Sequence, residues 1–543
     1  MIQNINQFKP ETSFETDICV VGAGAAGIDI SMFFNGTEKN VLLVESGDIK
    51  FIPEIQKLYE MKSIGKSIRN GEYNFNSHLA KNFKEECRVR MFGGTTNVWS
   101  GKWKMLEPID FLKKDWLSFS GWPISYEDLL PYYNEVAEKY NIPSLTKCLI
   151  ESQKTEITPS LFSKFPKLKY TIHYTQEPPL NFATAFYQQL EKSKNVKVIL
   201  CVNAYELVLD CEHKKVQLLR LKTLEGKAYS VIAKVFILAC GGLENARLLL
   251  NSNNQVKSGI GNSKDLVGRF YMDHPKGKLG IVKPLTNNTL SKLFLIENTN
   301  YKFGFSLSEN EQQESETLNH NFYCQPIYDE YGKIYSDITK KLKSAFLTRS
   351  FYKLIEVIKE LLLNYKAFLK ALIKILLRKN QKILAYEITH YLEQSPNYDS
   401  KLFLGEEVDA IGMKKIVIDW QLSPLDKIYF ERFINKMKEI FSESQLGEIM
   451  IDDEAHKNLE FVRDASHHMG TTRMGHTLDE GVVDSNCKVF GIENLYIAGS
   501  SVFPTGGNAN PTYTILALSR RLCHHLVTYF TKETGSMDTA RTI

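Results

Sequence analysis

Residues 17–27 read DICVVGAGAAG, and this stretch decides the fold. Asp17–Val21 is a short apolar run that predicts a strand, and Gly22–Gly27 is a G-x-G-x-x-G turn that leads into a helical stretch. A second apolar run, Val41–Val44, predicts the next strand and ends at Glu45, about 20 residues beyond the turn. Strand, glycine turn, helix and acid-terminated strand together predict a Rossmann-type α/β domain that binds a dinucleotide.

The residue types of this turn suit an anionic ligand. Glycines let the backbone approach a pyrophosphate, which would lie where free N–H groups and the helix dipole favour negative charge. The acidic residue would accept hydrogen bonds from a ribose diol. The alternative is a glycine turn needed only for tight packing of helix on strand. The residues expected to hold the dinucleotide here are Gly22, Gly24, Ala25, Ala26, Gly27 and Glu45.

Two polar blocks near the end of the chain carry the chemistry. Residues 466–471 read SHHMGT and residues 507–512 read GNANPT, on either side of the apolar run LYIAG at 495–499. The apolar run predicts a strand that ends in a loop. Histidine titrates near neutrality and can take a hydroxyl proton, whereas asparagine cannot titrate but can hold an oxygen in place. The blocks therefore predict a proton-handling pair held against the dinucleotide.

Three further segments follow the glycine turn in a recognisable order. They read MFGGTTNVWSG at 91–101, VFILACGG at 235–242 and GRFYMDHP at 268–275. With the two blocks above, the chain resembles the glucose–methanol–choline (GMC) family of FAD-dependent oxidoreductases over nearly its whole length, least between about 280 and 380. It looks closest to the sugar-oxidising branch, pyranose oxidase and sugar dehydrogenases, in which the active-site pair is His and Asn.

The resemblance implies roles for individual residues. The catalytic pair falls on His467, which Gly470 places in register, and on Asn510. His467 would act as the base while a hydride passes to the flavin, and Asn510 would position the substrate oxygen. Beyond the glycine turn, the implied FAD contacts are Gly93, Gly94, Thr95, Asn97 and Val98 in the flavin loop, Val202, Ala498, Gly499, Pro511 and Thr512.

Three other positions qualify this assignment. Some relatives attach FAD covalently through a His in the flavin loop, and the matching residue here is Val98, so FAD is expected to be non-covalent. His468 is expected to be a neighbour of the base or to face solvent. His274 is expected to be structural or to contact the cofactor domain. A structural, hydrogen-bonded histidine is the alternative for His467 itself.

The implied function is the oxidation of a CH–OH group of an alcohol or sugar-type substrate to a carbonyl, by an FAD-dependent dehydrogenase. An oxygen-using oxidase of the same family and a flavin-bearing hydroxynitrile-type lyase are alternatives. A non-catalytic FAD-binding scaffold fits poorly, because both His467 and Asn510 are present. The electron acceptor, a quinone, a protein or oxygen, stays open.

Composition agrees with a large globular enzyme. The chain has 543 residues, 43% hydrophobic and 24% charged, enough for two domains. Its nine cysteines are scattered, contain no C-x-x-C and are odd in number, which argues against disulfides and against metal sites. The polar start of the chain has no apolar core of a secretory signal, so a cytoplasmic location is expected.

Charge is concentrated in one segment. Residues 340–382 contain twelve Lys and Arg against two Glu, whereas the chain as a whole is +4. Lys366, Lys370, Lys374 and Arg378 fall four apart, on one face of a helix, and apolar residues such as leucine and isoleucine occupy the rest, which predicts basic amphipathic helices. They would be either a helical cap on the substrate domain or a peripheral contact with the inner face of the membrane. Nucleic-acid binding is not expected, since no binding motif accompanies the basic residues.

The predicted fold class is α/β, with a discontinuous Rossmann-like FAD-binding domain and a substrate domain built on an antiparallel sheet with helices. Strands are predicted at 386–394 and 415–420 in the second domain, and Tyr391, Glu393 and Gln394 are candidates to face the substrate. The boundaries are 1–130, 190–275 and 455–535 for the FAD domain, 131–189 and 276–454 for the substrate domain, and 536–543 for a loose tail.

Overall fold

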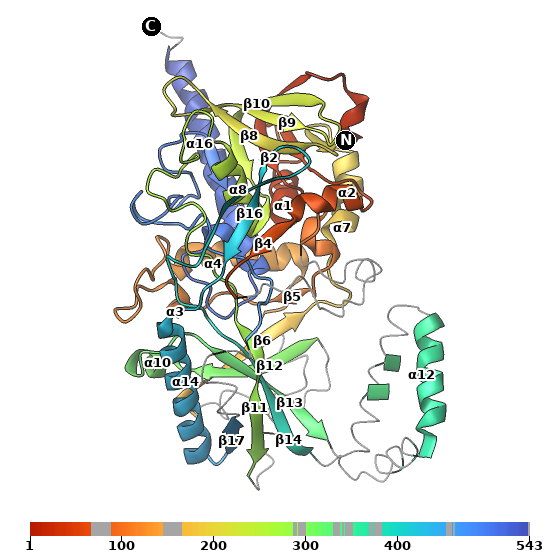
Figure 1. Ribbon diagram of the computed structural model, residues 1–543, viewed down its shortest axis with the longest axis vertical. Helices are drawn as coiled ribbons and strands as arrows, with labels where there is room; N and C mark the ends of the chain where they lie inside the picture. Colours follow the sequence, from red (N-terminus) through yellow and green to blue (C-terminus); the bar gives the residue numbers. More distant parts are fainter. Residues whose placement is uncertain are drawn as a thin grey trace.

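The computed structural model describes residues 1–66, 88–144, 165–285, 290, 300–328, 337–338, 341–342, 351–366, 369, 373, 383–451, 459 and 462–540. Three sheets organise this part of the chain (Figure 1). The predicted α/β class is confirmed.

The first sheet has eight strands. Its order is β1 (Ile2–Asn4), β7 (Val196–Leu200), β3 (Val41–Val44), β2 (Ser13–Val21), β10 (Ala228–Leu238), β9 (Val216–Lys222) and β8 (Asn203–Leu209), with β18 (Leu495–Ile497) also pairing with β10. Neighbours from β1 to β10, and β18 with β10, run parallel, while β8, β9 and β10 form an antiparallel meander. The parallel strands that the glycine turn predicts are therefore present.

Helices cover this sheet. Helix α1 (Ala25–Phe33) follows the glycine turn, and α16 (Thr512–Ala540) packs against both α1 and α4 (Tyr126–Tyr140). The other helices of this part are α2 (Pro53–Gln56), α3 (Pro108–Phe111), α7 (Phe182–Glu191) and α8 (Gly241–Asn251). Helix α16 includes residues 536–540 of the predicted loose tail, whose looseness stays a prediction, and 541–543 lie outside the described residues.

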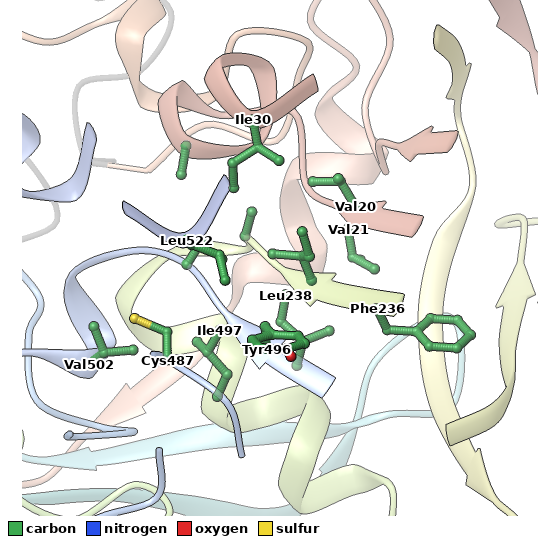
Figure 2. Packing of buried hydrophobic residues seen from close by; sticks show 14 of the residues in the cluster. Val20, Val21, Ile30, Phe236, Leu238, Cys487, Tyr496, Ile497, Val502 and Leu522 are labelled. Carbon is green, nitrogen blue, oxygen red and sulfur yellow. The ribbon is translucent and has the colours of Figure 1, made fainter. Parts of the chain in front are cut away.

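The core of this half lies between sheet and helices. Figure 2 shows Val20, Leu238 and Ile497, from the parallel strands β2, β10 and β18, with Ile30 of α1 and Leu522 of α16 nearby. All of these side chains are buried. Burial on both faces explains why these strands are continuous apolar runs instead of alternating ones.

The second sheet has seven antiparallel strands and lies below the first in Figure 1. Its order is β17 (Gly447–Ile451), β11 (Lys276–Pro284), β14 (Ile383–Tyr391), β13 (Asn321–Tyr328), β12 (Tyr301–Leu307), β6 (Leu168–Thr175) and β5 (Lys102–Trp103). Helix α14 (Pro424–Glu443) packs its apolar face, including Phe433 and Met437, on this sheet. Helix α10 (Glu309–Glu314) follows β12.

A small third sheet joins β15 (Lys401–Val408), β16 (Lys414–Asp419) and β4 (Met61–Ser63). The strand predicted at 415–420 is thus present as β16, but it pairs with β15 and β4 and not with the antiparallel sheet of the second domain. Ile416, Ile418 and Trp420 pack in the same core as the eight-stranded sheet.

The predicted domain boundaries stay a prediction. Membership of the two large sheets supports them, because the first sheet takes strands from 1–130, 190–275 and 455–535. Three strands cross them: β5, at 102–103, belongs to the second sheet, and β15 and β16 pack with the first. The short strand β5 lies at the edge of the second sheet, where it pairs antiparallel with β6.

The basic segment is described in part. Helix α12 (Phe351–Leu363) is present, and Figure 1 shows it at the side of β13 and β14. Ile358, Leu362 and Leu363 on this helix are exposed. Lys370, Lys374 and Arg378 lie outside the described residues. Within the described part of the chain, no helix combines the length and the apolar character needed to span a bilayer.

Candidate active site

A cavity of about 400 Å³ opens at the carboxyl edge of the eight-stranded sheet. The residues that end or follow β2, β3, β10 and β18 line it, since the carboxyl ends of parallel strands meet at one edge. Residues of the second sheet, Lys102, Lys276 and Tyr391, line its other side. The cavity therefore lies between the two large sheets.

Two glycines of the turn, Gly22 and Gly27, leave no room for a side chain. A Cβ on Gly22 would lie 2.7 Å from the Ala239 carbonyl oxygen, and one on Gly27 would lie 1.9 Å from the Gly22 oxygen. Gly24 is the N-cap of α1 and offers no side-chain cap, so the first N–H groups of the helix stay available to an anion. A Cβ on Gly24, which faces the cavity, would meet nothing within 4 Å. Gly27 does not line the cavity, because its role is helix–strand packing.

Glu45 lies at the end of β3 and lines the cavity. Its carboxylate accepts hydrogen bonds from the backbone N–H of Ala23 and of Gly47, both at 2.8 Å. Oε1 also accepts from the Ser46 hydroxyl at 3.1 Å, whereas Oε2 accepts only from Ala23 among the described residues and keeps a lone pair for a ribose hydroxyl.

Some residues of the predicted flavin loop line the cavity, and others hold the loop in shape. Gly94, Thr95 and Val98 line the cavity, whereas Gly93 and Asn97 do not. Gly93 has φ +93° at the start of a 3-10 turn, and its N–H bonds the Ala23 carbonyl at 2.9 Å. The Asn97 amide donates to Phe92 O and Gly94 O, at 3.0 and 2.8 Å. These two residues hold the shape of the loop and do not face the cavity.

The other predicted FAD contacts all face the cavity. They are Gly22, Ala25, Ala26, Val202, Ala498, Gly499, Pro511 and Thr512. Val202 follows β7, and its N–H bonds the Glu45 carbonyl at 3.2 Å, which places it beside the acid. Their assignment as FAD contacts stays a prediction that this shared location supports.

A charged cluster at the same cavity has no counterpart among the predicted residues. Arg90 and Arg88 pair with Glu244, at 2.6 and 3.2 Å, and both guanidinium groups lie 4.3 Å from the centre of the Tyr59 ring. All four residues line the cavity. The sequence signal is the alternation Arg88-Val89-Arg90, which in extended chain places both arginines on one side.

His467 and Asn510 meet at the end of the cavity that faces the second sheet. Asn510 Nδ2 lies 3.1 Å from His467 Nε2, and His467 Nδ1 lies 2.8 Å from Nδ1 of His274. Burial lowers the pKa of His467 well below 6.5, and His274, Lys276 and Lys102 lower it further. The imidazole is therefore neutral at neutral pH, as a proton acceptor must be.

The neighbouring histidine behaves differently. His468 is buried, not solvent-facing, and its ring stacks on Tyr271 with centroids 6.1 Å apart. Burial lowers the pKa of His468 to about 3. It lines the cavity where its backbone approaches Gly242, at which a Cβ would lie 2.1 Å from the His468 oxygen.

The three residues expected to face the substrate, Tyr391, Glu393 and Gln394, lie in different places. Tyr391 lines the cavity, and its hydroxyl accepts from Lys102 Nζ at 3.4 Å. Glu393 is buried elsewhere, where it accepts the Asn319 N–H at 2.8 Å. Gln394 accepts from the Trp420 indole at 2.9 Å. Only the first of these three faces the cavity, since β14 ends at Tyr391.

These residues fit FAD as the cofactor. The uncapped N-terminus of α1 suits the pyrophosphate of FAD, and the Glu45 carboxylate at the end of β3 suits its ribose. Glycines that face the cavity, such as Gly24, let the cofactor lie close to the backbone. At the end of the cavity that faces the second sheet, Asn510 Oδ1 is buried without a hydrogen-bond partner in the described part of the chain. This suits contact with a ligand bound there. Among the described residues, no group of His, Cys, Asp and Glu has the arrangement of a metal site.

Comparisons with known proteins agree with the geometry. Residues 396–519 match the family model described as GMC oxidoreductase. The chain is 22% identical to 6'''-hydroxyparomomycin C oxidase of Streptomyces lividus, over 94% of this chain and 92% of that protein. It is 22% identical to 2-methyl-1,2-propanediol dehydrogenase of Mycolicibacterium austroafricanum, over 93% and 94%.

The fold is similar to that of a solved structure. Pyridoxine 4-oxidase from Mesorbium loti superposes with a TM-score of 0.56 at 15% identity, covering 94% of this chain and 99% of that one. Sequence motifs, cavity and comparisons lead to one conclusion. The chain resembles the GMC oxidoreductases and is an FAD-dependent oxidoreductase that acts on CH–OH groups.

Proposed function

We propose that this enzyme oxidises a hydroxyl-bearing carbon of a small alcohol or sugar-type substrate, with His467 as the base and Asn510 as the positioning residue. The observation that carries the proposal is the 3.1 Å approach of Asn510 Nδ2 to His467 Nε2 on the wall of the FAD cavity. Oxidation removes a proton from oxygen and a hydride from carbon, so the site must provide an acceptor for each.

His467 provides the proton acceptor. Its Nε2 faces Asn510 and the cavity, and its low pKa keeps the ring unprotonated before substrate binds. A bound hydroxyl would donate to Nε2 and accept from the Asn510 amide, which replaces the bond that now joins the two side chains. Asn510 thus holds the oxygen within reach of the base.

FAD, when bound, supplies the hydride acceptor. We propose that it is held without a covalent bond, because Val98 offers no nucleophilic atom in the flavin loop and is buried among apolar neighbours. Glu45, the N-terminus of α1 and the cavity-lining part of the flavin loop would hold it.

We propose further that the enzyme is a dehydrogenase. Helix α12 exposes Ile358, Leu362 and Leu363 and belongs to the basic segment 340–382. Exposed apolar and basic residues in one segment suit contact with an anionic membrane surface and with an acceptor dissolved in it, such as a quinone. Reoxidation of the reduced enzyme decides this: a quinone analogue should reoxidise it much faster than oxygen does, and the reverse order would make it an oxidase.

The reaction itself is tested by anaerobic flavin reduction. Purified holoenzyme is mixed with a panel of sugars, sugar alcohols, sugar nucleotides and lipid-linked alcohols, and the absorbance of oxidised flavin is followed. Bleaching by at least one hydroxyl substrate, with the carbonyl product formed in equal amount, is the expected result. Product formation from a hydroxynitrile without bleaching would instead identify a lyase.

A further inference from the structure

His274 is the third member of a hydrogen-bonded chain at the active site. It is fully buried just before β11, and its Nε2 lies 3.2 Å from Gly506 O and 3.0 Å from Gly507 O. Its Nδ1 lies 2.8 Å from His467 Nδ1, with the two rings nearly perpendicular at 84°. The chain runs from the Gly506–Gly507 backbone through His274 and His467 to Asn510.

The positions of the protons follow from this chain. A carbonyl oxygen accepts but cannot donate, so His274 Nε2 must carry the hydrogen. A neutral imidazole has one N–H, which leaves a lone pair on His274 Nδ1. The nitrogen facing it, His467 Nδ1, must then be the donor. His467 Nε2 is left with the free lone pair, on the side of Asn510.

We propose that His274 is a positioning residue that fixes His467 in the tautomer whose Nε2 can take the substrate proton. The inference rests on the proposed role of His467 as the base. The opposite tautomer would place a hydrogen on Nε2 and leave no acceptor for the hydroxyl. The hydrogen-bond partner of one ring nitrogen decides whether the other nitrogen carries the hydrogen. A neutral acceptor facing Nδ1 of His467 is therefore enough to leave its Nε2 unprotonated.

The surroundings keep His274 neutral. Burial, with a smaller contribution from Lys104, lowers the pKa of His274 to about 4, against hydrogen bonds to Gly506 and Gly507 that raise it. Lys276, Lys102 and His468 are the other cationic or titratable groups that act on His467. A protonated His274 would donate to His467 and impose the wrong tautomer, and this state is rare at neutral pH.

The backbone on the His467 side is held by one carboxyl group. Asp273 accepts the N–H groups of His274 at 2.6 Å, Ala465 at 2.9 Å and His467 at 3.1 Å. Burial, and the nearby Asp464, raise the pKa of Asp273 well above 3.8, while these hydrogen bonds lower it. The two histidine backbones are thereby tied together, although 193 residues separate them.

The loop that carries the Gly506 and Gly507 carbonyls is also held in place. Gly507 has φ +52°, and a Cβ there would lie 2.5 Å from Asp110 Oδ2. A Cβ on Gly506 would lie 3.3 Å from His274 Nε2. Thr505 donates to Asp110 O at 2.8 Å, and Asn508 donates to Asn319 O at 2.9 Å. The loop therefore presents its two carbonyls to His274 at set positions.

The arrangement also serves the proton transfer. When His467 accepts a proton at Nε2, its Nδ1–H already points to His274, so the imidazolium that forms is stabilised without reorganisation. His274 is not among the residues that line the cavity, so its effect would pass through His467.

The test compares two substitutions of similar size in the holoenzyme. Asn in His274→Asn carries an acceptor oxygen at the δ position, and Leu in His274→Leu carries none. His274→Leu should lower the rate of flavin reduction at saturating substrate roughly 10–100-fold, the usual effect of removing a partner that orients a histidine, with FAD content and KM little changed. His274→Asn should recover most of that loss. Equal rates in both variants would overturn the proposal.

Nitrogen-15 NMR of histidine-labelled wild-type holoenzyme provides a measurement that needs no variant at His274. His467 Nε2 should be unprotonated and Nδ1 protonated at neutral pH, with the resonances assigned by loss in His467→Ala. A protonated Nε2 would refute the inference. Unimpaired flavin reduction in His467→Ala would refute the proposed function, whereas a slow His467→Ala beside a normal His274→Leu would refute this inference alone.

Discussion

His467 Nε2 and Asn510 Nδ2 lie 3.1 Å apart although the two residues are 43 positions apart in the chain. They come from loops on either side of β18, which pairs with β10 in the middle of the eight-stranded sheet. Gly470 N bonds Ser500 O at 3.2 Å, and Thr472 N bonds Ser501 O at 2.9 Å, so the first loop is tied to the end of β18. The pair is therefore placed by loops that flank a buried strand of the eight-stranded sheet.

Asn510→Ala should slow flavin reduction less than His467→Ala and more than His468→Ala. The amide positions the oxygen but takes no proton, so the expected loss is about 10-fold, near 1.4 kcal/mol. Stopped-flow reduction over a range of substrate concentrations measures it. An effect as large as that of His467→Ala would mean that Asn510 shares in the proton transfer.

The pH dependence of flavin reduction should report His467. The reaction needs the neutral ring, so the rate falls as the pH drops through the pKa of His467. Lys276 lowers that pKa, and Lys276→Met should therefore raise it and move the acid limb to higher pH. Lys278→Met is the control, because Lys278 is exposed and pairs with Glu387 at 2.7 Å. A shift of the limb to lower pH, or none, would contradict the assignment.

Much of the fold was within reach of the sequence. The glycine turn, two flanking apolar strands and Glu45 carry local signals, because backbone approach and strand burial restrict residue types at fixed spacing. The His and Asn blocks on either side of the apolar run 495–499 predict a proton-handling pair, and the family resemblance assigns it to His467 and Asn510. The structure places their side chains within hydrogen-bonding distance.

The rest of the site depends on contacts that no local pattern contains. The Arg90–Glu244 pair joins residues 154 positions apart, and His274 meets His467 across 193. Strand β16 was expected in the antiparallel sheet, yet its apolar side chains bury against the other core. Alternation alone shows that a strand is half-buried and does not show which neighbour buries it.

FAD should leave the protein on denaturation. Acid precipitation should release the yellow colour into the supernatant, because Val98 cannot form a bond to it. Val98→His would serve as a comparison, since it restores the residue that some relatives use for attachment. Flavin that stays in the wild-type pellet would reveal another attachment site and sink the prediction.

Segment 340–382 should bind anionic vesicles. Each Lys or Arg near such a surface contributes about 1 kcal/mol, over a Debye length of about 8 Å at physiological salt. Sedimentation with anionic but not neutral liposomes, abolished by high salt, is the expected result. Replacing Lys366, Lys370, Lys374 and Arg378 by Gln should abolish it, as should Leu362→Ser with Leu363→Ser. Equal recovery in the supernatant with both vesicle types would leave the segment as a helical cap.

The central claim, that His467 is the base of an alcohol oxidation, is tested most directly by anaerobic flavin reduction in a pair of variants. His467→Ala should lower the reduction rate by roughly 10²–10⁴, the contribution of a positioned base, with FAD content unchanged. His468→Ala, at the adjacent residue, should have a much smaller effect, because His468 packs on Tyr271 and not against Asn510. The account predicts that order. A slow His468→Ala beside a normal His467→Ala would contradict it.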